Sequence, residues 1–247
     1  MRIGPWWIQP YTVRVMLGGV LAIGWLVWRA PAYAMPRRDV TAWLWSLGLI
    51  TVFGGRVGYV LENWGYFTQN PHQIWQLDAV GGLCGEAALF GAIVCTWGWA
   101  TLSHVSPVII LTWLTPAILL TIAGAWWGCL AIGCAWGREV PFTVAESNNL
   151  VAQLPDIYHS IRFRYAVQVF GIAWAIVMWI FSVGLKRYGD IILGIYLLGA
   201  ALLTLLRGDP VPEIQAIRID TLVYILLAFW LFWTGITQRK KPSFSPT

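Results

Sequence analysis

Charged residues are scarce in this sequence. Asp, Glu, Lys and Arg make up 11% of its 247 residues, whereas a soluble domain has about 25%. So few charges cannot cover a surface that faces water, which excludes an ordinary soluble domain. The alternating ten-residue segments that mark an outer-membrane barrel are also absent. Since backbone groups in lipid must be hydrogen-bonded within their own element, the sequence predicts transmembrane helices.

Several short motifs that carry chemistry are missing as well. The sequence has no Gly-x-Ser-x-Gly elbow, no phosphate-binding loop and no HExxH helix, which excludes the common serine hydrolase, nucleotide and zinc-protease sites. The four cysteines lack zinc-ribbon spacing, so we expect no metal and no cofactor. The net charge of +5 is spread along the chain, which argues against a nucleic-acid partner.

The cysteines lie within or at the ends of apolar runs, where cysteine usually serves as a small buried hydrophobe. Cys129 and Cys134 are five residues apart, which on a helix separates them by about 140°. That angle disfavours a shared metal ion. A disulfide between them requires the helix to break near Gly133, and this alternative stays open.

Apolar runs make up most of the chain. They cover approximately residues 13–28, 42–61, 80–100, 105–125, 165–185, 191–206 and 222–233. Because a spanning helix needs about 20 apolar residues, we predict an all-α integral membrane protein with about seven transmembrane helices. These form a single transmembrane domain over residues 1–237. The polar stretch 137–164 predicts a small extracytoplasmic cap between helices four and five.

The basic residues favour one orientation of the chain. Lysine and arginine cluster at residues 37–38 and 239–241, and positively charged loops stay in the cytoplasm. We therefore expect a cytoplasmic C-terminus, with residues 238–247 as a basic, flexible tail.

Two charges fall inside predicted spans. Arg56 lies in the second run and Glu86 in the third, and a buried ion costs several kcal/mol unless it is paired or solvated. One interpretation is a structural ion pair between neighbouring helices, and another is a polar pocket for a lipid headgroup. Snorkelling to the interface is a third. The glycines around both residues allow close helix packing and also leave space for a headgroup.

Five segments resemble a known family and occur in its order. The segment 54–71, GGRVGYVLENWGYFTQNP, resembles the second-helix region of bacterial prolipoprotein diacylglyceryl transferases. The next two, GGLCGEAALFGA (81–92) and AWWGCLAIGCAWGRE (125–139), are similar to that family's GGLSFHGGLLGA and GRIGNFINGELWGRP. The last two, RYAVQVF (164–170) and LLRGDPVPE (205–213), are similar to its RYPSQLYE and FFREPD.

The resemblance implies a fold, a location and a chemistry. Those enzymes are seven-helix proteins of the bacterial plasma membrane with a periplasmic cap. They move a diacylglyceryl group from phosphatidylglycerol to the thiol of a lipobox cysteine, and glycerol phosphate leaves. The resemblance therefore implies a phospholipid partner, and phospholipid binding by Arg56, Tyr59 and Arg207.

The sequence departs from the family pattern at polar positions. The departures are Glu86 for a His, Trp126 for the signature Arg, Cys129 for an Asn, Cys134 for a Glu and Gly171 for a Glu. An arginine donates paired bonds to a phosphate, whereas tryptophan offers one neutral donor.

These departures predict a pseudoenzyme, in which catalysis is lost or altered. Such a protein would act as a lipid-binding accessory subunit of a larger membrane complex. The alternative is an active phosphatidylglycerol–prolipoprotein diacylglyceryl transferase of lipoprotein biosynthesis. In that case Glu86 and Gln168 are the expected catalytic residues.

Overall fold

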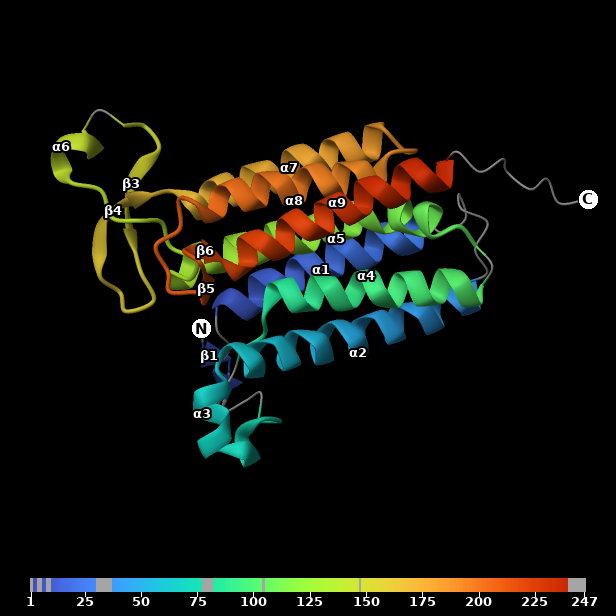
Figure 1. The fold of residues 1–247 in the computed structure, drawn as a ribbon, viewed down its shortest axis with the longest axis horizontal. Coiled ribbons are helices and arrows are strands. Elements are labelled where there is room, and N and C mark those ends of the chain that lie inside the picture. Colours follow the sequence, from blue (N-terminus) through green and yellow to red (C-terminus); the bar gives the residue numbers. More distant parts are fainter. Residues whose placement is uncertain are drawn as a thin grey trace, which may run out of the picture. The chain divides into compact units, whose positions relative to one another are not determined.

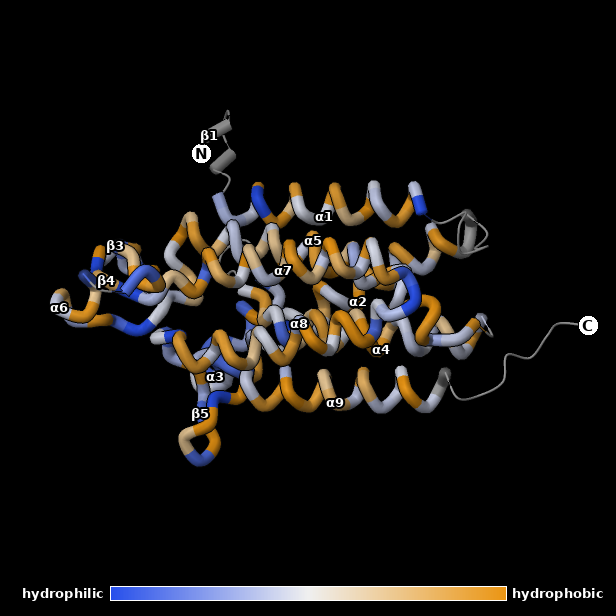
Figure 2. Tube along the Cα trace, turned by 90° about the horizontal axis from the view of Figure 1, so that it is seen from above, coloured by the Kyte–Doolittle hydropathy of each residue, from blue (hydrophilic) through white to orange (hydrophobic). Residues whose placement is uncertain are grey.

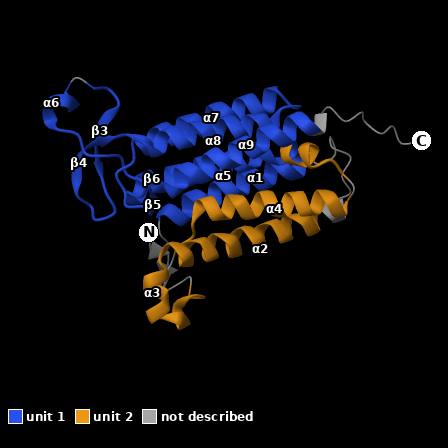
Figure 3. Cartoon of the chain, viewed as in Figure 1, with its two compact units in different colours: residues 1–29, 112–247 blue, residues 30–111 orange. Residues whose placement is uncertain are grey.

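The computed structural model describes residues 2–3, 6–7, 10–29, 37–76, 82–103, 105–146 and 148–239. Most of the predicted tail, residues 240–247, and Gly81 lie outside the described residues. The chain divides into two compact units (Figure 3). Unit 1 comprises Met1–Arg29 and Thr112–Thr247, and unit 2 comprises Ala30–Leu111.

Helices make up most of the described chain (Figure 1). They are α1 (Pro10–Arg29), α2 (Arg37–Glu62), α3 (Trp64–Gln69), the 3-10 helix η2 (Pro71–Gln73), α4 (Gly85–Leu102), α5 (Pro107–Ile132), α6 (Phe142–Ala145), α7 (Val167–Gly184), α8 (Gly189–Thr204) and α9 (Ile219–Arg239). Three antiparallel hairpins complete the description. Their strands are β1 (Arg2–Ile3) with β2 (Trp6–Trp7), β3 (Val151–Pro155) with β4 (Ile161–Tyr165), and β5 (Glu213–Ile214) with β6 (Ile217–Arg218).

Five of the described helices are long and apolar enough to cross a membrane. They are α1, α2 from Val40, α5, α7, and α9 as far as Thr237. The helix α8 is apolar but has only 16 residues. The protein is therefore mainly helical, as expected for a helical membrane protein. Each predicted apolar run overlaps one long helix, and the crossing of the membrane by α4 and α8 stays a prediction.

In unit 2, α2 and α4 pack closely because glycines face the partner helix. A Cβ at Gly58 would lie 2.3 Å from the Cβ of Ala87, and one at Gly91 would lie 3.1 Å from the carbonyl oxygen of Ile50. These contacts run in opposite directions along the two helices, so α2 and α4 are antiparallel. Small residues at such a seam allow the backbones to approach and gain van der Waals contact.

In unit 1, a similar seam joins α1 to α5. A Cβ at Gly18 would lie 2.8 Å from the carbonyl oxygen of Leu120, and one at Gly124 would lie 2.8 Å from the carbonyl oxygen of Arg14. The ring of Tyr11 covers Gly128, where a Cβ would lie 2.7 Å from a ring carbon. The position of α1 on α5 is therefore fixed over about two helical turns.

Polar structure collects at one end of unit 1. Figures 1 and 2 show that the start of α1, the end of α5 and the starts of α7 and α9 lie at this end, together with the hairpins β3–β4 and β5–β6. Hydrophobic residues dominate the lengths of the helices (Figure 2). This separation is the one expected when helices lie in lipid and their connections lie in water.

The segment 137–164, expected as a cap, contains an ordered β-hairpin. The carboxylate of Asp156 accepts backbone N–H bonds from Tyr158 and Ser160 at 2.8 and 2.9 Å, which closes the turn between β3 and β4. The buried Arg164 pairs with Asp156 at 3.0 Å and with Glu139 at 2.7 Å. The segment lies between α5 and α7 in the sequence, and its extracytoplasmic location stays a prediction.

The α2–α4 seam gives a direct test of the packing. Gly58→Ala is expected to lower the unfolding free energy by about 1–3 kcal/mol, because overpacking forces the two helices apart. Gly48 of the same helix has nothing within 4 Å of where its Cβ would be. Gly48→Ala should therefore be neutral, or stabilising by up to about 1 kcal/mol. Thermal unfolding in detergent measures both, and equal effects of the two substitutions would refute the seam.

Candidate functional site

The segment 125–139, at the end of α5, contains a disulfide. Helix α5 stops at Ile132, and Gly133 turns the chain with φ of 73°, a conformation that favours glycine. A Cβ here would also lie 2.4 Å from the carbonyl oxygen of Asp156. The turn brings the Cα atoms of Cys129 and Cys134 to 4.6 Å, and the two side chains are disulfide-bonded.

The expectation that cysteines serve as small buried hydrophobes does not hold for this pair. The alternative left open for it does, because the helix ends at Ile132 and the two cysteines form a disulfide. The helical separation of the two side chains does not apply, because the helix ends before the second cysteine. The expectation is confirmed for Cys84 and Cys95, which are free and buried.

Gln168 lies directly beside the disulfide. It is in the first turn of α7 and is 1% exposed. Its Nε2 donates to the carbonyl oxygen of Cys134 at 3.0 Å. Its Oε1 is buried and accepts no hydrogen bond from the described residues. Of the predicted site residues in unit 1, the structure thus brings Gln168, Cys129 and Cys134 together.

Trp126 and Gly171 pack against each other. A Cβ at Gly171 would lie 2.3 Å from the indole ring of Trp126, so the ring occupies the space that a larger side chain would need. The indole N–H donates to the hydroxyl of Tyr196 at 3.1 Å. The resemblance places an Arg and a Glu at these two positions. Here they form one apolar contact between α5 and α7.

Arg207 belongs to a four-residue ionic cluster. Its Nε and Nη2 donate to the two carboxylate oxygens of Asp209 at 2.8 and 2.5 Å, and its Nη1 donates to Asp220 at 3.0 Å. Arg218 donates to both carboxylate oxygens of Asp220 at 3.1 and 3.0 Å, and to the backbone oxygen of Asp209 at 2.9 Å. Two cations thus face two anions, and the cluster is neutral.

The electrostatics keep Arg207 charged. Burial alone would lower the pKa of Arg207, but the hydrogen bonds and charge of Asp209, with further help from Asp220, raise that pKa above its ordinary value. Sequence reasoning identified Arg207 and missed Arg218 and Asp220. The available signal was the repeated Arg-x-Asp spacing at 207–209 and 218–220.

In unit 2, Arg56 is buried to 2% exposure and bonds to backbone carbonyls. It donates to the oxygens of Ile74, Gln73 and Gly82 at 2.6, 2.8 and 3.2 Å. Its guanidinium lies 5.6 Å from the ring centroid of Tyr59, itself a predicted site residue. Arg56 therefore ties α2 to the chain that follows α3. The ion-pair and headgroup interpretations stay predictions.

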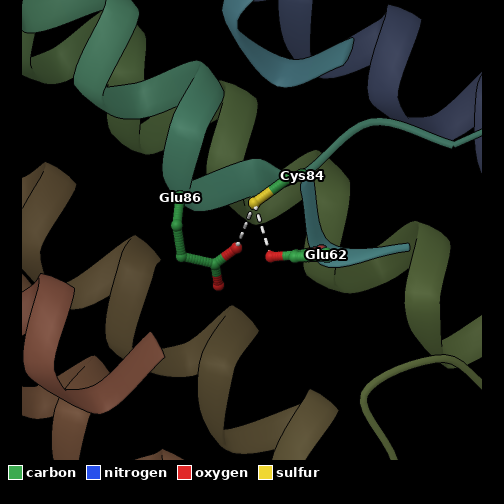
Figure 4. A group of neighbouring side chains, drawn as sticks. All are labelled: Glu62, Cys84 and Glu86. Carbon is green, nitrogen blue, oxygen red and sulfur yellow. Dashed lines mark hydrogen bonds between the residues drawn. The ribbon is translucent and has the colours of Figure 1, made fainter. Parts of the chain in front are cut away.

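Glu86 stands in a cluster with Glu62 and Cys84 (Figure 4). The thiol of Cys84 lies 3.0 Å from an oxygen of Glu62 and 3.3 Å from an oxygen of Glu86. One thiol proton can serve only one carboxylate at a time. The three potential ligand atoms lie within 4.8 Å of one another, so these residues could also hold a metal ion. Sequence reasoning flagged Glu86 and missed its two neighbours, which come from the end of α2 and the residues before α4.

The comparison with known families agrees with the motif order. The model of the prolipoprotein diacylglyceryl transferase family matches residues 1–234. The chain belongs to this family. Its members are multi-pass proteins of the bacterial inner membrane, which agrees with the five apolar helices.

Similar proteins in the family come from diverse bacteria and are named phosphatidylglycerol–prolipoprotein diacylglyceryl transferases. One from Coxiella burnetii (strain RSA 331 / Henzerling II) is 29% identical over 198 residues, 75% of this chain and 70% of that protein. One from Streptococcus uberis is 25% identical over 228 residues, 91% of this chain and 85% of that protein. One from Dehalococcoides mccartyi (strain CBDB1) is 30% identical over 138 residues, 55% of this chain and 52% of that protein.

The contact between Trp126 and Gly171 can be tested with a double-mutant cycle. Gly171→Ala alone should destabilise the protein by about 1–3 kcal/mol, because the new methyl group meets the indole ring. In a Trp126→Ala background the same change should cost less, with a coupling energy of about 0.5–3 kcal/mol. Gly184→Ala, at an open position of α7, is the control. Additive effects on thermal unfolding would show that the two residues do not touch.

The disulfide can be detected directly. In protein purified without reductant, peptide mapping should find Cys129 linked to Cys134, and Cys84 and Cys95 alkylated only after unfolding. Because the bond closes a short loop, reduction should lower stability by about 2 kcal/mol. Cys129→Ser should abolish the effect of reductant. Alkylation of Cys129 or Cys134 in the unreduced protein would contradict the pairing.

Proposed function

We propose that this chain is a phospholipid-binding membrane protein on the transferase fold, in which catalysis is lost or altered. Its role would be that of an accessory subunit in a larger membrane complex. The observation that carries the proposal is the contact of Trp126 with Gly171. Transfer from phosphatidylglycerol expels a glycerol phosphate anion, which needs well-placed cationic donors. A tryptophan packed on a glycine supplies no cation and leaves no space for one.

Two further observations support altered chemistry. Cys129 and Cys134 are joined in a disulfide, so neither offers the carboxylate or amide of the family pattern. Arg207 faces Asp209 and Asp220 at hydrogen-bond distance, so it would bind a phosphate but stabilise a leaving phosphate less than a free cation would.

The proposal retains phospholipid binding at Arg56 and Tyr59 in unit 2 and at Arg207 in unit 1. A guanidinium has five N–H donors. The described bonds of Arg207 use three of them, and the others are available to a phosphate oxygen. Arg56 would act mainly by holding the chain around Tyr59, whose ring it faces.

In the proposed topology, α4 and α8 cross the plasma membrane together with the five candidate spans, and all seven helices form one transmembrane domain. Disulfides persist in oxidising compartments. We therefore place the end of unit 1 that carries the Cys129–Cys134 bond, and the segment 137–164, outside the cytoplasm. With an odd number of spans, the C-terminus and its basic tail would be cytoplasmic.

The alternative function is an active phosphatidylglycerol–prolipoprotein diacylglyceryl transferase. Family membership and the names of the relatives favour it. In this case the carboxylate of Glu86 would take the proton of the lipobox thiol. The thiolate would attack the glyceryl carbon, and glycerol phosphate would leave. The position of Glu86 beside a second acid, Glu62, and the Cys84 thiol is the feature that supports such a base.

Purification from the native membrane tests the accessory role. The protein, tagged at one end and extracted in mild detergent, is expected to elute with stable membrane-protein partners. Phospholipid should remain bound, and Arg207→Gln should reduce it, whereas Arg138→Gln, an exposed neighbour, should not. A monodisperse protein free of partners would contradict the accessory role.

Rescue of a transferase-depleted strain separates the two functions. We expect no rescue by the wild-type chain. Growth that depends on the chain and is lost in Glu86→Gln would establish the alternative, with Glu86 as its base.

A further inference from the structure

Arg14 is a cation inside an apolar helix, and its side chain contacts a tryptophan ring instead of a carboxylate. It lies four residues after the start of α1, a 20-residue candidate span. Its guanidinium carbon lies 5.1 Å from the ring centroid of Trp127 on α5. Its Nη1 is buried and has no hydrogen-bond acceptor among the described residues, and no described carboxylate pairs with it. Every other arginine discussed above has oxygen partners.

The backbone on both sides of this contact is fixed. The carbonyl of Arg14 lies against Gly124, and the ring of Tyr11, one turn earlier, lies against Gly128. The guanidinium is therefore held beside the end of α5 by the helix seam. Trp127 is 42% exposed, so the stacked pair lies on an accessible face of the unit.

The depth of Arg14 suits a headgroup. Four residues of helix correspond to about 6 Å along the axis, which places the guanidinium close to the boundary between hydrocarbon and headgroups. Tryptophan is enriched at the same depth. Phosphate diesters of phospholipids lie at this level.

We propose that Arg14 and Trp127 form a binding site for the phosphate of a membrane phospholipid. The indole covers one face of the guanidinium by a cation–π contact. The in-plane N–H donors stay at the edge, where a phosphate can accept two of them in parallel. The donors available to it are Nε and Nη2 of Arg14, because protein atoms cover Nη1.

The site goes beyond the proposed function, because neither Arg14 nor Trp127 belongs to the residues assigned there. The site also lies beside Trp126. The turn of α5 that has a tryptophan in place of the signature arginine receives a guanidinium from α1 instead. This arginine reaches the lipid-facing side of the turn, next to Trp127.

The test measures lipid binding to purified, delipidated full-length protein by native mass spectrometry. Phosphatidylglycerol and diacylglycerol of the same acyl chains are the two probes. Arg14→Met should weaken phosphatidylglycerol binding about tenfold and leave diacylglycerol unchanged. Trp127→Ala, which retains the charge, should weaken phosphatidylglycerol binding by a smaller factor. Arg162→Met removes an exposed arginine of β4 and is the matched control.

The outcomes are distinguishable. Wild-type affinity of Arg14→Met for phosphatidylglycerol would overturn the site, even if Arg207→Gln lost lipid and so supported the proposed function. Displacement of the lipid by millimolar inorganic phosphate would overturn the lipid assignment in favour of a soluble phosphate ester. Retention of the lipid in that competition, with loss in Arg14→Met, is the expected result.

Discussion

The absence of hydrogen-bond partners in hydrocarbon is the constraint on which this structure depends. An unpaired buried polar group costs several kcal/mol there, so the backbone forms helices and the buried charges are paired. Arg56 donates to backbone carbonyls, Arg164 to two acids, and Arg207 shares two aspartates with Arg218. Arg56 reaches these carbonyls from within α2, Arg164 lies in β4, and Arg207 follows α8. Arg14 differs from these arginines, because it stacks on Trp127 and pairs with no carboxylate of the described residues.

Where the family resemblance places polar side chains, this chain has an apolar contact and a disulfide. The ring of Trp126 fills the space above Gly171, and the signature cysteines close a disulfide at the end of α5. The indole N–H of Trp126 still has an acceptor in the hydroxyl of Tyr196. An isolated loss of one polar residue would leave its partner buried and unpaired. The paired replacement would let the fold persist if the chemistry is altered, as we propose.

Much of the fold could be predicted because apolar runs of helical length determine where helices form. Each run overlaps a helix, and the cap predicted for 137–164 stays a prediction. Contacts between distant segments could not be predicted. Arg218 joins Arg207 only because the hairpin β5–β6 returns the chain. The local cysteine pair was an open alternative in the sequence, because it depended on a helix break near Gly133. Glu62 and Cys84 reach Glu86 through the packing of α2 on α4, which periodicity alone does not fix.

Turnover by the purified protein tests the central claim most directly. The full chain, in nanodiscs that contain phosphatidylglycerol, is incubated with a lipobox peptide, and diacylglyceryl-modified peptide and released glycerol phosphate are quantified. The Coxiella burnetii relative serves as the positive control. The account predicts no product above background, because Trp126 and Gly171 replace a polar pair with an apolar contact. Product formed at a rate comparable to that of the control protein would contradict it.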